Sequence, residues 1–328
     1  MPNRSVEDMI TAEGLSKRYG DKLAVDNASF TVRPGLVTGF LGPNGAGKST
    51  TMRMIVGLDR PTSGTVTVNG QPYAKLKAPL SEVGVLLDAK AVHTGRSARN
   101  HLRAMAATHG IPSSRVDEVI DLAGIGSVAR KRAGGFSLGM GQRLGIAAAL
   151  LGDPHTLILD EPVNGLDPEG VRWVRQFVRH AASEGRTVLL SSHLMSEMSQ
   201  TADHVIVLGR GKVLADAPLP ALVRAWTTAR VHVRSPRAAE LADAVSGREV
   251  EVVSSDQFTL DVTGLPASRI GDIAAERGIA VHELTPTSGS LEDAYLALTG
   301  DAVEYRNRAV PQDAAQQAAQ PTPEEVRA

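Results

Sequence analysis

The segment Gly42–Thr50 is the feature that most constrains the fold, because it reads Gly-Pro-Asn-Gly-Ala-Gly-Lys-Ser-Thr and fits the phosphate-loop pattern G-x-x-x-x-G-K-[ST]. The apolar run Leu36–Leu41 precedes it and predicts a buried strand. The segment Lys48–Val56 lacks Gly and Pro, and Gly57 follows it, which predicts a short helix with a glycine stop. Strand, glycine-rich loop and helix in this order indicate an α/β protein that binds a nucleotide.

Each residue type of this loop has a physical task. Glycines let successive backbone N–H groups converge on phosphate oxygens, and the N-terminus of the following helix adds a favourable dipole. Lys48 supplies a positive charge to the β- and γ-phosphates, and Ser49 is expected to ligate Mg²⁺. The expected nucleotide-binding residues are Gly42, Pro43, Asn44, Gly45, Ala46, Gly47, Lys48, Ser49 and Thr50. The alternative, a chance glycine-rich turn, explains neither the strand before the loop nor the helix after it.

A second strand, Thr156–Leu159, ends in two adjacent carboxylates, Asp160 and Glu161. Asp160 suits the coordination shell of Mg²⁺, and Glu161 suits a general base that polarises an attacking water. Ligands of open α/β sheets bind at the carboxyl ends of the strands, where this pair is placed. The alternative is an acidic helix N-terminus, since Pro162 follows.

With these two motifs in place, residues 9–218 resemble the ATP-binding subunits of ABC transporters. The segment Phe136–Arg143 is similar to the signature motif of that family, although Phe136, Leu138 and Met140 depart from its usual residues. The resemblance implies that Ser137 and Gly139 hold the γ-phosphate of the nucleotide bound by a partner subunit. A serine that only caps a helix N-terminus is the alternative for Ser137.

Further positions match the family in register. The segment Asn164–Asp167 resembles the loop that crosses the dimer interface, and the resemblance implies that Asp167 lies near the nucleotide. His193 resembles the switch histidine that contacts the γ-phosphate; the alternative is an ordinary packed or surface histidine. The resemblance thus implies Glu161, His193 and Lys48 as the catalytic residues, with ATP and Mg²⁺ as the cofactors.

Two positions need separate comment. Tyr19 lies where the family places an aromatic ring that stacks on adenine, and a half-exposed strand tyrosine is the alternative. Asp88 stands where the family usually has a glutamine at the hinge into the helical subdomain. A carboxylate can approach Mg²⁺, but it is repelled by a triphosphate until the metal is present. We therefore expect Asp88 to make turnover more dependent on the metal or on the partner than glutamine would.

The resemblance implies that residues 9–218 form the ATP-binding domain, with an antiparallel β subdomain beside the core sheet. The residue pattern itself predicts that the core sheet is mainly parallel and that a helical subdomain lies at about 89–151. Residues 228–300 alternate as βαββαβ followed by a helix, which predicts a small α+β domain of ferredoxin-like type. Residues 301–328 contain no Leu, Ile, Met, Phe or Trp and predict a disordered tail.

Composition excludes several functional classes. The formal charge is −1, so no overall electrostatic potential attracts nucleic acid, and we expect no nucleic acid as a partner. The chain has no cysteine, which removes disulfides and thiolate chemistry. Apolar runs such as Ile146–Leu151 are much shorter than the roughly 18 residues of a membrane-spanning helix. The N-terminus lacks the apolar segment of a signal peptide, so a cytoplasmic location is expected.

The segment Ser288–Gly300 and the pattern before it look like the C-terminal domain of ABC-2 exporters, which include antibiotic and multidrug resistance transporters. The resemblance implies a peripheral subunit on the cytoplasmic face of the membrane. It would dimerise head to tail around ATP and power export through a separate membrane permease that contacts the segment Ala89–His101. The alternatives are a non-transport ABC ATPase and a regulatory or sequestering protein that binds nucleotide without turnover. The first would require tandem ATPase units or a long coiled-coil insertion, and also a basic surface, whereas this sequence has one unit, no heptads and a charge of −1. Glu161 argues against the second, because loss of that carboxylate is the simplest way to lose hydrolysis.

Overall fold

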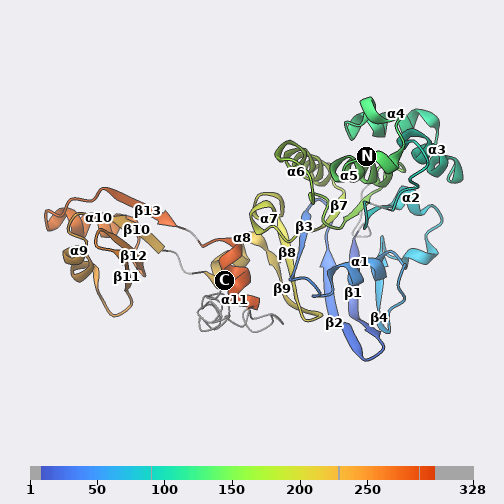
Figure 1. The fold of residues 1–328 in the computed structure, drawn as a ribbon. Coiled ribbons are helices and arrows are strands. Elements are labelled where there is room, and N and C mark those ends of the chain that lie inside the picture. Colours follow the sequence, from blue (N-terminus) through green and yellow to red (C-terminus); the bar gives the residue numbers. More distant parts are fainter. Residues whose placement is uncertain (1–8, 90, 228–229, 288, 300–328) are drawn as a thin grey trace, which may run out of the picture.

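The computed structural model describes residues 9–89, 91–227, 230–287 and 289–299. These ranges contain a six-stranded sheet, a three-stranded antiparallel sheet and a separate four-stranded sheet. Figure 1 shows the first two sheets together in the N-terminal part, and the third in the C-terminal part. The predicted fold class, with its parallel core, antiparallel subdomain, helical subdomain and C-terminal α+β domain, is confirmed.

The six-stranded sheet has five parallel strands and one antiparallel edge strand, β9. In spatial order its strands are β5 (Val83–Leu86), β6 (Thr156–Leu159), β7 (Thr187–Ser191), β3 (Val37–Leu41), β8 (His204–Gly209) and β9 (Lys212–Pro218). Strands β3, β6, β7 and β8 are buried along their whole length. Their continuous apolar character therefore reflects a sheet that is covered on both faces.

Alternate residues of each central strand enter two different hydrophobic cores. On β3, Val37 and Leu41 join the core that contains the helices, whereas Phe40 joins the core beneath the antiparallel sheet. On β6, Leu157 and Ile158 divide in the same way. The two-residue period of strands thus ties the sheet to both neighbouring layers.

The antiparallel sheet has the order β2 (Lys22–Val32), β1 (Ile10–Tyr19) and β4 (Ser63–Val68). The sequence predicts a hairpin in which residues 72–73 pair with this last strand, and this prediction is wrong. Only a single bridge joins Val68 to Gln71, because the chain enters a 3-10 helix at Tyr73, with Pro72 as its N-cap. The remaining elements here are α1 (Lys48–Ile55), the short 3-10 helix η1 (Tyr73–Lys75) and α2 (Pro79–Glu82).

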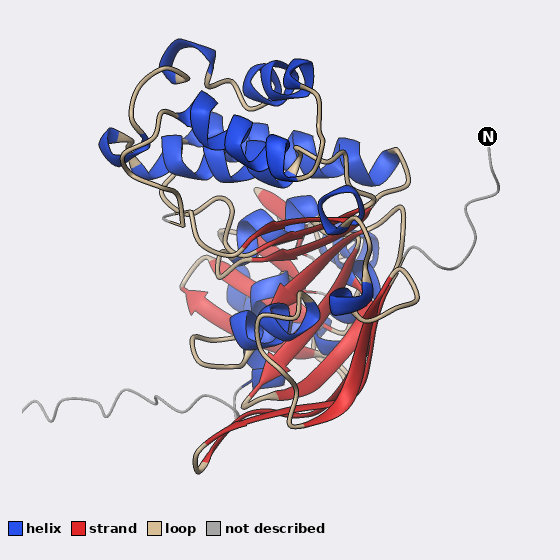
Figure 2. Cartoon of the chain, turned by 90° about the vertical axis from the view of Figure 1, so that its right-hand side faces the viewer, coloured by secondary structure: helices blue, strands red, loops and turns tan. Residues whose placement is uncertain are grey.

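The helical subdomain forms a layer of helices at one end of the sheets (Figure 2). It comprises α3 (Ala98–Thr108), α4 (Ser113–Leu122), the 3-10 helices η2 (Gly126–Val128) and η3 (Ala133–Gly135), and α5 (Leu138–Ala149). Helix α3 begins after Ser97, whose hydroxyl accepts the N–H of Asn100 and caps the helix. Leu102 of α3 and Val119 of α4 are fully buried, so their apolar faces make the subdomain core.

Two helices follow β6 and β7. Helix α6 (Pro168–Ser183) has an apolar stripe, with Val174 and Val178 buried in the large core. Helix α7 (Met195–Thr201) follows β7 and buries Met198 in the same core.

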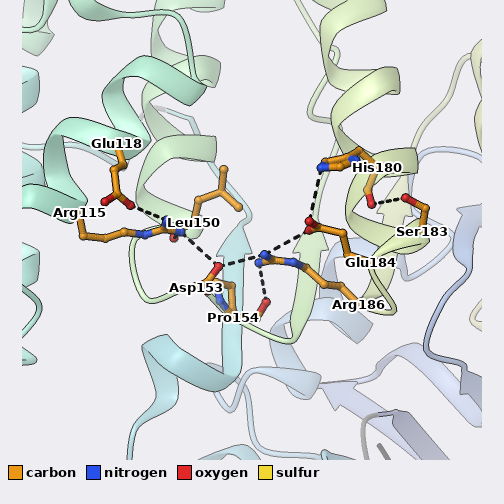
Figure 3. Close-up of polar contacts among 9 residues, drawn as sticks. All are labelled: Arg115, Glu118, Leu150, Asp153, Pro154, His180, Ser183, Glu184 and Arg186. Atoms are coloured by element: carbon orange, nitrogen blue, oxygen red, sulfur yellow. Dashed lines mark hydrogen bonds and ion pairs between the residues drawn. The ribbon is translucent and has the colours of Figure 1, made fainter. Parts of the chain in front are cut away.

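A network of charged side chains connects the helical subdomain to the core sheet (Figure 3). Asp153, in the loop between α5 and β6, accepts hydrogen bonds from two arginines. Arg115 of α4 reaches it at 3.3 Å, and Arg186, just before β7, reaches it at 2.9 Å. Arg115 also donates to Glu118, and Arg186 also pairs with Glu184. One carboxylate therefore joins two parts of the chain that lie far apart in sequence.

The C-terminal sheet is antiparallel, with the order β11 (Glu251–Asp256), β12 (Thr259–Thr263), β10 (Arg230–Arg234) and β13 (Glu283–Thr287). Two helices complete it, α9 (Ala238–Val245) and α10 (Ala267–Glu276). Numbered within this unit, the spatial order is second, third, first and fourth, which is the ferredoxin-like arrangement.

The last strand of this sheet begins at Glu283 and not at the apolar residues directly after α10. The reason is that Ile279 closes the end of α10: its N–H donates to the carbonyl of Ala274, and its side chain is buried in the domain core.

Helices α8 (Leu219–Trp226) and α11 (Leu291–Thr299) pack against each other and against the N-terminal domain. Leu222, Leu291 and Tyr295 belong to the same large core as β8 and α7. The sequence analysis assigned residues 291–298 to the C-terminal domain, and this packing corrects that assignment. The buried apolar face of α11 contacts α7 and α8 instead of the C-terminal sheet.

Two predictions concern other segments. The tail expected at 301–328 lies outside the described residues. Among the helices that the structure does describe, none combines the length and the apolar character needed to span a bilayer.

Candidate nucleotide-binding site

The phosphate loop connects β3 to α1 as the sequence predicts, and its glycines are required by geometry. Gly47, at the N-cap of α1, has a φ of 105°. A Cβ atom at this position would lie 2.6 Å from the carbonyl oxygen of Ala24. Any residue with a side chain would therefore be strained in its backbone and would also clash with β2. The loop is completed by Thr51, whose hydroxyl donates to the carbonyl of Gly47 at 2.9 Å.

A cavity of about 450 Å³ opens over this loop. The residues that line it are Tyr19, Lys22, Ala24, Pro43, Asn44, Gly45, Gly47, Lys48, Ser49, Thr50, Asp160 and Glu161. The structure thus brings the phosphate loop, both carboxylates and Tyr19 to one place. Gly42 and Ala46 are buried and are not among the residues that line the cavity. A Cβ at Gly42 would approach the carbonyl oxygen of Leu208 to 2.7 Å.

The sequence analysis missed Lys22 and Ala24, which begin β2 at the edge of the cavity. A turn signal was present in Gly20 and Asp21, directly after Tyr19. A turn predicts a hairpin only where a strand is recognised on each side of it, and the strand before this turn, β1, was not predicted. The pairing of Tyr19 with Lys22 therefore could not be foreseen.

Lys48 is nearly buried, with 7% of its surface exposed, and its ammonium group is held by the loop itself. The Nζ atom donates to the carbonyl of Gly42 at 2.7 Å and to that of Pro43 at 3.4 Å. Burial lowers the pKa of Lys48, and the nearby charges of Glu161 and Asp160 oppose that shift. A partly desolvated cation at the floor of a cavity is well suited to bind phosphate oxygens.

The two carboxylates are fixed by the ends of β6 and β7. The backbone N–H of Asp160 donates to the carbonyl of Leu86 on β5 at 2.7 Å, which prolongs the sheet ladder. The hydroxyl of Ser191, the last residue of β7, donates to Asp160 Oδ1 at 2.5 Å and accepts the N–H of Glu161 at 2.9 Å. Ser191 was not predicted as a site residue, and it holds both carboxylate residues in place.

Glu161 has a φ of 50°, in the left-handed region that residues other than glycine seldom adopt. Such a backbone is usually retained where the surrounding structure holds it and a function needs it. Its carboxylate oxygen Oε2 lies 2.5 Å from Nδ1 of His193. His193 does not line the cavity, but this contact places its half-exposed ring beside the carboxylate.

Tyr19 lies at the cavity edge, and polar contacts fix its ring. Its hydroxyl donates to Asp59 at 2.7 Å, and Nε of Arg53 donates to the same carboxylate at 2.7 Å. The hydrogen bond from Arg53 is the main reason that the pKa of Asp59 is lowered. The ammonium of Lys17 lies 4.9 Å from the centre of the Tyr19 ring, within the range of a cation–π contact.

The signature residues surround a second cavity of about 340 Å³. It is lined by Ser137, Leu138, Gly139, Met140, Arg143, Gly165, Leu166 and Asp167. The structure therefore groups Ser137, Gly139 and Asp167 with one another, away from the phosphate loop of the same chain.

Both Ser137 and Asp167 act as helix caps within this chain. The hydroxyl of Ser137 accepts the N–H of Met140 at 3.2 Å, and Asp167 accepts that of Gly170 at 2.9 Å. The unusual Leu138 packs over Gly165, where a Cβ would come within 2.1 Å of the leucine Cδ2. The departure from the family signature thus fills space between α5 and the loop before α6.

The oxygen donors fit Mg²⁺ in part. Ser49 and Asp160 line the same cavity, and hydroxyl and carboxylate oxygens are suitable ligands for this hard cation. Asp88 is not among the residues that line the cavity; its carbonyl accepts the N–H of Ala91 in the loop after β5. In the described part of the chain, no three or more His, Asp and Glu side chains are arranged so that they could hold a metal ion by themselves. Nucleotide oxygens and water would therefore complete the coordination shell.

Comparison with known proteins supports this interpretation. A family model described as ABC transporter matches residues 25–164, and one described as a domain of unknown function matches residues 229–292. The chain is 35% identical to the bacitracin transport ATP-binding protein BcrA of Bacillus licheniformis, over 89% of this chain and 97% of that protein. It is 33% identical to the Nod factor export ATP-binding protein I of Rhizobium sp. (strain N33), over 90% of this chain and 98% of that protein.

Among solved structures, the ATP-binding subunit of an ABC transporter aligns with 66% of this chain and 92% of its own length. The TM-score is 0.61 and the identity is 26%. These similarities cover the phosphate loop, both carboxylates and the signature helix in one continuous domain. The chain therefore belongs to the ABC transporter family, as an ATP-binding subunit that hydrolyses ATP.

Proposed function

We propose that this chain powers the export of a small molecule through a separate membrane permease, by forming an ATP-bound head-to-tail dimer. The observation that carries the proposal is the separation of two half-sites on one chain. The phosphate loop and Glu161 line one cavity, whereas Ser137 and Gly139 line another. A second copy, turned by a twofold rotation, would place its signature residues over the first copy's phosphate loop, and the reverse.

Within one half-site, the residues divide the chemistry as follows. Loop amides and Lys48 bind and orient the phosphates, and Tyr19 stacks on the base. Glu161 accepts the proton of the attacking water, and His193 orients the Glu161 carboxylate from 2.5 Å away. Ser49 and Asp160 would hold Mg²⁺, which supplies charge neutralisation to the triphosphate when it is bound.

ATP then acts as the link between two copies. Ser137 and Gly139 of one copy contact the γ-phosphate that the partner's loop holds, so nucleotide binding favours the closed dimer. Hydrolysis removes the γ-phosphate together with those contacts, and the dimer opens. The chemical step is in this way converted into a change of distance between two subunits.

The proposed direction of transport, export, is inferred from the related proteins. One acts in bacitracin transport and another in Nod factor export, and each aligns with nearly the whole of this chain. We extend their role to this chain as export of a drug, antibiotic or lipid-like compound. The permease would meet the helical subdomain near residues 91–101, and the chain would act at the cytoplasmic face of the membrane.

The experiment that tests the dimer compares Glu161→Gln and Lys48→Ala by size-exclusion chromatography at saturating Mg-ATP. Glu161→Gln removes the base and keeps the phosphate contacts, so we expect it to bind ATP and elute as a dimer. Lys48→Ala removes a buried cation from the cavity, so we expect neither binding nor dimerisation. A Glu161→Gln chain that binds ATP and stays monomeric contradicts the head-to-tail arrangement.

The permease is tested separately, by purifying the tagged full chain from detergent-solubilised membranes of its native host. We expect an integral membrane protein with several spans to copurify. Its absence, in the presence of an ATP-induced dimer, would refute the transport role and leave the ATPase intact.

A further inference from the structure

Gln142 is a buried polar residue on α5 that contacts the backbone of the catalytic loop. Only 5% of its surface is exposed. Its amide Nε2 donates to the carbonyl of Glu161 at 3.1 Å and lies 3.4 Å from the carbonyl of Asn164. The helix that carries the signature motif is thereby hydrogen-bonded to the peptide unit of the general base.

These contacts complete the immobilisation of Glu161. Ser191 binds its N–H and His193 binds its carboxylate, while its carbonyl accepts from Gln142 and from the backbone N–H of Asn164, each at 3.1 Å. A residue with a φ of 50° keeps that conformation only while its surroundings hold it. The direction in which the Glu161 carboxylate points is consequently sensitive to each of these partners, of which Gln142 is the one that belongs to α5.

Gln142 is also rigidly joined to Ser137. The two residues lie on one helix, and the N–H of Gly141 donates to the carbonyl of Ser137 at 2.9 Å in its first turn. A displacement of the helix N-terminus is therefore passed to Gln142 almost undiminished, because an α-helix is stiff over a single turn.

We propose that Gln142 is a positioning residue that couples the signature of each chain to that chain's own Glu161. This inference rests on the proposed head-to-tail dimer. In that dimer, Ser137 senses the nucleotide on the partner's loop, whereas Glu161 acts on the nucleotide of its own loop. Gln142 thus connects the two nucleotide sites, and ATP at one site adjusts the base at the other.

The orientation of the Gln142 amide determines which substitutions test the hydrogen bond. Its nitrogen faces two carbonyl oxygens, and its Oε1 is buried with no hydrogen-bond partner among the residues that the structure describes. Gln142→Met keeps the length of the side chain and removes the donor. Gln142→Glu keeps the shape and places an anion against the carbonyl of Glu161, so it should be the more damaging change.

The test measures ATP hydrolysis by the full chain over a range of ATP concentrations, together with the melting temperature. We expect Gln142→Met to lower kcat by about tenfold, because a displaced base reacts poorly, and to leave KM within about twofold. We also expect the Hill coefficient for ATP to fall toward 1, since the link between the sites is lost. Thr201→Val is the matched control: it removes a hydrogen bond from another nearly buried side chain, on α7, and should change only the melting temperature.

If Gln142 had only a structural role, Gln142→Met would lower the melting temperature and leave kcat and the Hill coefficient at wild-type values. That result would overturn the proposal. Wild-type protein with a Hill coefficient of 1 overturns it as well. If Gln142→Met does not fold, Gln142→Asn, which is too short to reach Glu161, is judged by the same criteria. The dimer assay with Glu161→Gln leaves Gln142 intact. If that chain fails to dimerise, the proposed function itself is contradicted; if it dimerises and Gln142→Met behaves like the wild type, only the coupling through Gln142 is contradicted.

Discussion

The Nδ1 atom of His193 lies 2.5 Å from Oε2 of Glu161, so the residue that we propose as the general base shares a hydrogen bond with the histidine. His193 follows β7 and Glu161 follows β6, and these strands are neighbours in the parallel sheet. The contact is therefore built by adjacent strand ends, and it orients the carboxylate at the edge where ligands bind.

Replacing His193 with alanine should lower kcat by about a hundredfold with little change in KM, because the Glu161 carboxylate loses its orienting partner. Single-turnover and steady-state hydrolysis of ATP by the full chain measure both constants. His193→Gln, which can still donate a hydrogen bond, should recover part of the activity. A His193→Ala chain with wild-type kcat would show that this contact has no catalytic role.

Tyr19 offers a test of base stacking. Tyr19→Ala should raise the Kd for ATP by about tenfold, since a stacked base contributes about 1–3 kcal/mol. Tyr19→Phe keeps the ring and loses only the hydrogen bond to Asp59, so its Kd should stay within about threefold of the wild type. Calorimetric titration with ATP measures both. Equal losses in the two variants would assign the effect to the hydroxyl and not to the ring.

Burial lowers the pKa of Lys48 from 10.5, which makes the stability of the nucleotide-free chain depend on pH in a defined direction. Between the folded and unfolded pKa values, the unfolded chain binds more protons, so the free energy of unfolding rises with pH. Lys48→Met lacks this group. The stability of the wild type relative to Lys48→Met should therefore increase as the pH rises toward 10.5, when both are measured by urea titration. A constant difference between pH 7 and that value contradicts the prediction.

Asp153 joins Arg115 of the helical subdomain to Arg186 of the core, and its removal tests the network in Figure 3. Asp153→Asn should lower the free energy of unfolding by about 1 kcal/mol at low salt, because exposed ion pairs contribute little individually and somewhat more in networks. In 1 M NaCl the effect should shrink, since screening is then much stronger. Asp243→Asn, on α9, is the control. Equal effects at both salt concentrations would exclude an ionic origin.

Asp88 departs from the family, and its role is tested through Mg²⁺. Asp88→Gln should reach half-maximal ATPase rate at a lower Mg²⁺ concentration than the parent, because a neutral amide does not repel the triphosphate before the metal binds. ATP hydrolysis is measured across a Mg²⁺ titration at fixed ATP. Superimposable curves would remove the hypothesis.

The phosphate loop and the carboxylate pair were predictable because their chemistry is local. Lys48, Asp160 and Glu161 each follow directly from a motif and the strand before it, and the structure brings them to one cavity. The fold class followed from the alternation of strands and helices. Two strands were missed: β1, in the middle of the antiparallel sheet, and β9, at the edge of the six-stranded sheet. Both have a polar side and lack the continuous apolar run that marks a buried strand.

Contacts that depend on tertiary structure were not predictable. Ser191 and Gln142 support Glu161 from positions far away in sequence, and their roles depend on the register of β6 beside β7 and on the packing of α5. Asp59 and Lys17 meet at the Tyr19 ring for the same reason. No spacing rule links such residues, because folding alone brings them together.

The pairing of α8 with α11 has a consequence for how this protein can be dissected. The ferredoxin-like unit leaves the N-terminal domain after α8 and returns to it at α11, so its two attachment points lie close together. A truncation after residue 227 would strip Leu291 and Tyr295 from their shared core and expose the apolar side of Leu222. Excising only residues 230–287 and bridging the gap with a short flexible peptide keeps the packing of α8 against α11. This internal deletion, and not the truncation, is therefore the variant that tests what the ferredoxin-like unit contributes.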